Sequence, residues 1–137
     1  MNEYRWEDLS PGMAAGFQTT ITGQMLDTFG ALSGDMNPLH TDESFARSRG
    51  FEGAVVHGLL VSALYSRLVG MHLPGRDCIL HEIRVVFASP AYAGDELTVA
   101  GAVSHMNHAY RQLEIKGRIR RGSVPISRAT IRVGMSG

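Results

Sequence analysis

The sequence predicts an α+β fold in which an antiparallel sheet curls around one buried helix. The sequence predicts mainly helix for residues 24 to 73 and mainly strands for residues 78 to 134, so the chain divides into two halves. A stretch near the end of the first half, from about Gly58 to Val69, is apolar over most of its circumference, which is typical of a buried helix. A buried helix followed by several strands with short connections favours a sheet wrapped around that helix.

The predicted central helix carries apolar side chains on nearly all of its sides, at Leu59, Leu60, Val61, Ala63, Leu64, Leu68 and Val69. A helix at the surface of a protein confines such residues to one stripe, so this pattern predicts burial all round. At about 1.5 Å per residue the helix would be roughly 18 Å long.

The second half of the chain alternates with the period of two that strands require. From Leu113 to Arg120 every odd position is apolar or glycine and every even position is charged, which predicts a strand with one wet face. Similar patterns occur at Leu97 to Val103 and at Ala129 to Val133, and a β-branched run extends from Ile83 to Phe87. Turn residues separate these segments at Ser89-Pro90, Gly94-Asp95, Met106-Asn107 and Arg121-Gly122-Ser123.

Length and composition limit the classes of function. The 137 residues predict a single domain over residues 1–137, and 13 basic residues balance 13 acidic ones, which argues against a nucleic-acid partner. The charged N-terminus is unlike a signal peptide, and the longest apolar stretch, residues 58–71, is shorter than the roughly 20 residues that span a bilayer. With one cysteine, Cys78, the chain has no internal disulfide, so we expect a cytoplasmic protein without a membrane partner.

The stretch around Asp35 and His40 carries the residues best suited to chemistry. They lie five positions apart across Asn37-Pro38, and Pro38 keeps Asn37 out of helical geometry, which predicts a rigid loop rather than a helical turn. A carboxylate and an imidazole on a rigid loop suit an acid/base pair. Spacing alone nevertheless favours the simpler interpretation, a helix cap followed by an ordinary loop histidine.

A resemblance to a known family changes that balance. The segment resembles the signature of the MaoC-like hydratases, which include the (R)-specific enoyl-CoA hydratases, at Phe29, Leu32, Ser33, Gly34, Asp35, Asn37, Pro38, Leu39, His40 and Ala46. Further likeness lies at Val56-His57-Gly58-Leu59, at Val86-Phe87 through Pro90 and at Gly94-Asp95-Glu96-Leu97, so that it covers roughly residues 17 to 134. The resemblance implies a hot-dog fold and the reversible hydration of trans-2-enoyl-CoA to (R)-3-hydroxyacyl-CoA.

The same resemblance implies roles for individual residues. Asp35 and His40 would hold and activate one water, although the sequence does not say which is acid and which is base. Gly58 would offer its backbone N–H to the thioester oxygen, since the start of a helix presents unpaired N–H groups and glycine admits close approach. Asn37, Ser66 and His57 are the expected substrate-binding residues. His57 could instead support the structure, and Ser66 could bond its own helix.

The sequence leaves several partners open. No metal or cofactor is expected, because there is no zinc-type ligand cluster and no phosphate-binding glycine loop. The acyl thioester could be carried by coenzyme A or by an acyl carrier protein. The basic run Lys116, Arg118, Arg120 and Arg121 is either a solvated strand face or a contact for coenzyme A phosphates or an acidic carrier.

Exposed sheet edges favour a homodimer joined edge to edge. A thioesterase or a non-catalytic thioester-binding domain is the alternative.

Overall fold

A five-stranded antiparallel sheet forms the body of the protein, and a computed structural model describes residues 1–136 of it. The strand order is β1-β3-β4-β5-β2, and the strands are β1 (Ala14–Thr20), β2 (Cys78–Phe87), β3 (Glu96–Asn107), β4 (Gln112–Arg121) and β5 (Val124–Met135). The four strands predicted for the second half of the chain are confirmed. The first strand, β1, was not predicted.

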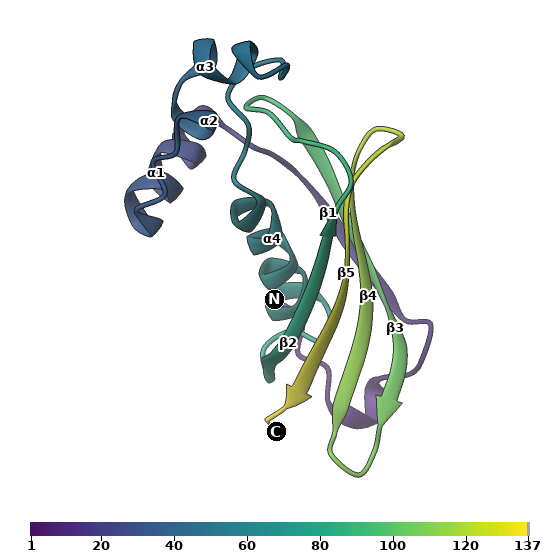
Figure 1. The fold of residues 1–137 in the computed structure, drawn as a ribbon. Coiled ribbons are helices and arrows are strands. Elements are labelled where there is room, and N and C mark those ends of the chain that lie inside the picture. The colour runs from purple at the N-terminus through teal and green to yellow at the C-terminus, as the bar shows by residue number, and fades with distance from the viewer. Residues whose placement is uncertain (137) are drawn as a thin grey trace.

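Helix α4 (Gly58–Arg67) runs along one face of the curved sheet, which confirms the α+β prediction (Figure 1). It continues into a π-helical turn, η2 (Leu68–His72), and the chain begins with a short 3₁₀ helix, η1 (Trp6–Asp8). The helices α1 (Gly23–Ser33), α2 (Pro38–Thr41) and α3 (Glu43–Ser48) gather beyond one end of α4 (Figure 1). No helix among residues 1–136 is long and apolar enough to cross a membrane.

The core lies between α4 and the sheet, and Tyr65 is its largest fully buried side chain. Its ring lies directly over Gly117 in the middle of β4, where an added Cβ would be 2.8 Å from the ring. The Tyr65 hydroxyl and the buried Ser127 hydroxyl of β5 lie within hydrogen-bond distance, 2.8 Å apart. Burial raises the pKa of Tyr65 to about 12, so the phenol stays neutral and keeps this bond over the physiological pH range.

The expectation that the central helix is buried on every side is wrong for the single chain. Leu59 is 73% exposed, and Ala63 and Ser66 on the same helix are also exposed. The sheet covers only one side of α4. The apolar pattern in the sequence does not show which part of the protein, if any, packs against each side of the helix. An apolar strip of α4 is therefore left open.

The turn expected at Met106-Asn107 lies a little further along the chain. Strand β3 continues through Asn107, and the turn is formed by residues 108–111, with Arg111 at a φ of 46°. The Asn107 side chain accepts a hydrogen bond from the Tyr110 N–H, so Asn107 shapes the turn from its own strand end. Met106 and Asn107 therefore belong to β3.

Strand β2 is an edge strand with many apolar side chains in the open. It pairs with β5 on one side, and no strand among residues 1–136 pairs with its other side. Its exposed apolar residues are Ile79, Leu80, Ile83, Val86 and Phe87. A long apolar edge of this kind is a template for pairing with another strand.

Candidate active site

Three local devices fix the loop that carries Asp35. Helix α1 ends at Gly34, whose φ of 78° is a left-handed conformation that favours glycine. The side chain of Asn37 accepts a hydrogen bond from the Leu39 N–H and caps α2, and Pro38 occupies the first turn of that helix. Asp35 thus lies in a loop, as expected, but His40 lies on a one-turn helix, because Pro38 suits a helix start.

The catalytic pair predicted from the sequence is brought together. The Nε2 atom of His40 lies 3.7 Å from Oδ2 of Asp35, and Nδ1 of His40 lies 2.7 Å from the backbone oxygen of Val55. A carbonyl oxygen can only accept, so Nδ1 of His40 carries the hydrogen, and Nε2 presents a lone pair whenever the ring is neutral. Two acceptors therefore face each other across a gap too long for a direct hydrogen bond. One water donating to both would fit that arrangement.

The pair is only partly shielded from solvent. The side chain of His40 is 13% exposed, whereas that of Asp35 is 49% exposed. His40 is therefore largely enclosed by its neighbours, whereas about half of the Asp35 side chain faces solvent.

His57 lies behind the pair and contacts both members. Its Nε2 atom lies 3.0 Å from the backbone oxygen of Asp35, and its ring stacks on that of His40 with centroids 4.0 Å apart. Phe29 packs against the ring from another direction, at 4.9 Å. His57 is 2% exposed, and its Nδ1 atom has no hydrogen-bond partner among the described residues. These contacts suit a residue that positions the pair more than one that touches a substrate.

Asp35, His40 and His57 are also the kinds of side chain that bind metals, and one ligand atom of each lies within 4.8 Å of the others. The geometry does not favour a shared ion. The two imidazole planes are stacked at 25°, so their in-plane lone pairs run side by side instead of converging. One nitrogen of each ring is already engaged with a backbone carbonyl oxygen. The cluster suits proton transfer better than metal binding.

Dialysis against EDTA should therefore leave catalytic activity unchanged. The measurement is the initial rate before and after dialysis, with the dialysed protein also assayed after addition of Zn²⁺ or Mg²⁺. Activity that disappears on dialysis and returns with one of these ions would contradict the expectation.

A pocket of ≈ 300 Å³ opens beside His40 and the start of α4. It is lined by His40, Val55, Val56, Gly58, Val61, Phe87, Ala88, Ser89, Pro90, Ala91 and Ile126. Gly58 is the first residue of α4, so its N–H has no acceptor within the helix. A Cβ at this position would lie 3.0 Å from the Phe87 ring. Glycine therefore lets the Phe87 ring pack closely against the start of α4.

The remaining expected residues lie elsewhere. Asn37 is exposed and its side-chain oxygen caps α2, so it shapes the loop between the two predicted catalytic residues. Ser66 is exposed on α4, about 12 Å along the helix from Gly58 at 1.5 Å per residue, and does not line the pocket within the described residues. The carbonyl of Val55 and the ring of Phe87 are site features that the sequence did not single out, since neither belongs to a polar motif.

Known proteins resemble this chain in sequence and in fold. The family model described as "MaoC like domain" matches residues 9–122. An (R)-specific enoyl-CoA hydratase of Aeromonas caviae is 38% identical over 92 residues, which are 67% of this chain and 69% of that protein. An (R)-specific enoyl-CoA hydratase of Rhodospirillum rubrum is 31% identical over 99 residues, 72% of this chain and 69% of that protein.

The solved structure of an (R)-hydratase from A. caviae involved in PHA biosynthesis superposes with a TM-score of 0.90 at 31% identity. The superposition covers 94% of this chain and 98% of that chain. The expected hot-dog fold, a curved sheet with a helix packed along it, is confirmed.

Proposed function

This chain belongs to the MaoC-like domain family, and from that premise we propose that it reversibly hydrates trans-2-enoyl-CoA to (R)-3-hydroxyacyl-CoA. The observation that carries the proposal is the pairing of Asp35 with His40 beside a pocket that Gly58 also lines. Hydro-lyase activity on an acyl thioester needs an activated water and a group that stabilises negative charge at the thioester oxygen. The proposal is supported because His40 and Gly58, which would serve these two needs, line the same pocket.

In the proposed mechanism one water donates its hydrogens to Nε2 of His40 and to the Asp35 carboxylate. As the water oxygen bonds to Cβ of the enoyl chain, its proton passes to this pair, and electron density moves to the thioester oxygen. The Gly58 N–H stabilises that charge in its enolate-like form. The pair then delivers a proton to Cα, so one water is added across the double bond and the protein returns to its initial protonation state.

The loss of enoyl-thioester absorbance tests this function directly. We expect the absorbance of the enoyl thioester to fall when the protein is added to trans-2-enoyl-CoA of chain length C4, C8 or C12. The same acyl groups on an acyl carrier protein should be tried in parallel, since a 3-hydroxyacyl-[acyl-carrier-protein] dehydratase of Arabidopsis thaliana is 40% identical over 77 residues, 56% of this chain and 45% of that protein.

Release of free thiol without loss of the double bond would contradict the proposal and indicate a thioesterase. The helix argues against that alternative, because it carries no carboxylate between Gly58 and Arg67. A protein that leaves every one of these thioesters intact would fit the non-catalytic alternative.

We also propose that the working unit is a homodimer joined through β2. The exposed apolar residues of this edge strand support edge-to-edge pairing of two sheets, and two-fold dimers are the commonest soluble oligomers. Phe87 belongs to the same strand and lines the pocket, so the pocket would lie near the subunit boundary. A cytoplasmic location is supported by the single cysteine, which has no internal disulfide partner.

Light scattering should accordingly give a mass of twice 14.9 kDa. Ile83→Lys should shift the protein towards monomer, because it places like charges across the joined edges. Val124→Lys is the matched control, since Val124 is 38% exposed against 36% for Ile83 but lies outside β2. A fully active wild-type species at the monomer mass would overturn the dimer proposal.

A further inference from the structure

The sheet face turned away from α4 carries a cluster of five cations on a chain whose formal net charge is zero. This basic face consists of the exposed residues Arg84, Lys116, Arg118, Arg120 and Arg128. Their neighbours along the strands, such as Ile115 and Ile119, are buried in the core, and side chains alternate between the two faces of a sheet. The cations of β2, β4 and β5 therefore project together on the outer side.

The register shows that this clustering opposes folding. Arg118 of β4 lies directly opposite Arg128 of β5, and like charges placed in this way are destabilising. Among the described residues, neither of them has a carboxylate within 4.0 Å, and the same holds for Arg84 and Arg120. The repulsion is relieved when an anion binds between such side chains.

A neighbouring row on the same face is built differently. Arg132 lies between Glu82 and Glu114, at 3.6 Å and 3.7 Å from their carboxylate oxygens. Carboxylates on neighbouring strands therefore balance the charge of Arg132. Among the described residues, the uncompensated arginines of this face are Arg84, Arg118, Arg120 and Arg128, and the last three line one hollow.

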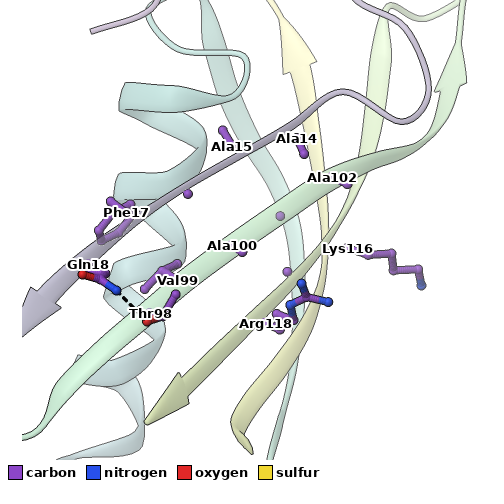
Figure 2. A pocket seen from close by; sticks show the side chains of 13 residues that line it. Ala14, Ala15, Phe17, Gln18, Thr98, Val99, Ala100, Ala102, Lys116 and Arg118 are labelled. Carbon is purple, nitrogen blue, oxygen red and sulfur yellow. Dashed lines mark hydrogen bonds between the residues drawn. The ribbon is translucent and has the colours of Figure 1, made fainter. Parts of the chain in front are cut away.

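Shallow hollows accompany these cations. Figure 2 shows Lys116 and Arg118 reaching out from β4 beside Ala100 and Ala102 of β3, in a groove of ≈ 620 Å³. A second hollow of ≈ 320 Å³ is lined by Arg118, Arg120 and Arg128 together with Val86, Ala88, Ile119, Pro125 and Ser127. Small neighbouring side chains leave the guanidinium groups accessible.

The second hollow and the catalytic pocket share one lining residue, just after the end of β2. Ala88 lines both of them. Phe87 lies against Gly58 on the inner side, while its neighbour Val86 pairs with Arg128 on the outer side. A flexible chain that leaves the pocket past Ala88 therefore arrives at the arginines after crossing a single strand end.

We propose that Arg118, Arg120 and Arg128 bind phosphate at the carrier end of the thioester substrate while its acyl end occupies the pocket at His40 and Gly58. The inference rests on the proposed function, since it concerns the same substrate. Both coenzyme A and an acyl carrier protein hold the thiol on a pantetheine arm whose far end bears phosphate. Guanidinium groups suit this anion, because their planar N–H fork matches two phosphate oxygens.

The test compares two thioesters of the same enoyl group, one on coenzyme A and one on N-acetylcysteamine, which has no phosphate. In Arg118→Gln and in Arg128→Gln, the ratio of kcat/KM for the first to kcat/KM for the second should fall about fivefold, and about 20-fold or more in the double variant. Arg132→Gln, a cation on the same face but in the compensated row, is the matched control and should change the ratio less than about twofold.

A third arm uses the same enoyl group on an acyl carrier protein. If the ratio of kcat/KM relative to the N-acetylcysteamine thioester falls for coenzyme A, the arginines bind the phosphate of coenzyme A; if it falls for the acyl carrier protein, they bind the phosphate of that carrier. A fall with either carrier supports the proposal. A double variant that keeps the wild-type ratio with both carriers would overturn it. The proposed function fails separately, if the wild-type protein hydrates neither the phosphate-bearing thioesters nor the N-acetylcysteamine thioester.

Discussion

Asp35→Asn should lower kcat for enoyl-thioester hydration by about 10²–10⁴-fold, the usual effect of losing a positioned acid or base. The amide keeps the size of the side chain, and its oxygen can still accept the Asn37 N–H bond that the Asp35 carboxylate accepts at 3.3 Å. The loop should therefore keep its shape while losing the charge and the proton acceptor. His40→Ala should have an effect of the same size.

The double variant should be little worse than either single variant, because the two residues act on one water as a unit. Asp42→Asn is a matched control from the same region. The Asp42 side chain caps α3 by accepting the Phe45 N–H, and asparagine caps a helix about as well as aspartate. If Asp35→Asn or His40→Ala kept more than about a third of the wild-type kcat, the assignment of the pair would be wrong.

Tyr65→Ala should destabilise the protein by about 3–5 kcal/mol, the usual loss when a large buried ring is removed. Tyr65 is completely buried, and its ring fills the space between α4 and Gly117. The cavity left behind would lie at the centre of the core. Urea denaturation measures the loss as a fall in the free energy of unfolding.

Tyr65→Phe separates packing from hydrogen bonding. It keeps the ring and removes only the hydroxyl, which leaves the buried Ser127 hydroxyl without its partner, at a cost of about 1–2 kcal/mol. Tyr110→Ala is the exposed control, since Tyr110 is 80% exposed and should change stability by no more than about 0.5 kcal/mol. Equal stability of Tyr65→Ala and Tyr110→Ala would show that the core is not organised around Tyr65.

A strand could be predicted from the sequence where apolar and charged side chains alternate, but not where the residues are small and lack that alternation. In β4 charged and apolar residues alternate from Leu113 to Arg120, and the structure forms a strand there. Strand β1 begins Ala14-Ala15-Gly16, a composition with low strand propensity. It forms because it pairs with β3, and a Cβ at Gly16 would lie only 2.6 Å from the Val99 oxygen. That requirement belongs to the assembled sheet and leaves no local pattern.

The residues of the candidate site also fall into two groups, those that a short sequence segment indicates and those that only the fold brings together. The spacing of Asp35 and His40 and the rigid Asn37-Pro38 step lie within one short segment, so the sequence could indicate the pair. The contact of His57 with the Asp35 carbonyl joins residues 22 positions apart and depends on how the start of α4 meets the loop. Sequence alone therefore predicted His57 as a substrate contact or a structural support without choosing, and its burial behind the pair emerges only from the fold.

Turnover in ¹⁸O-labelled water, followed by mass spectrometry of the product, tests most directly the claim that Asp35 and His40 add water to an enoyl thioester. The wild-type protein should place the label in the hydroxyl group at C3 of an intact 3-hydroxyacyl thioester. Asp35→Asn should place almost none there in the same time. Label found instead in a free carboxylate, with the double bond retained, would mean that the site hydrolyses thioesters and would contradict this account.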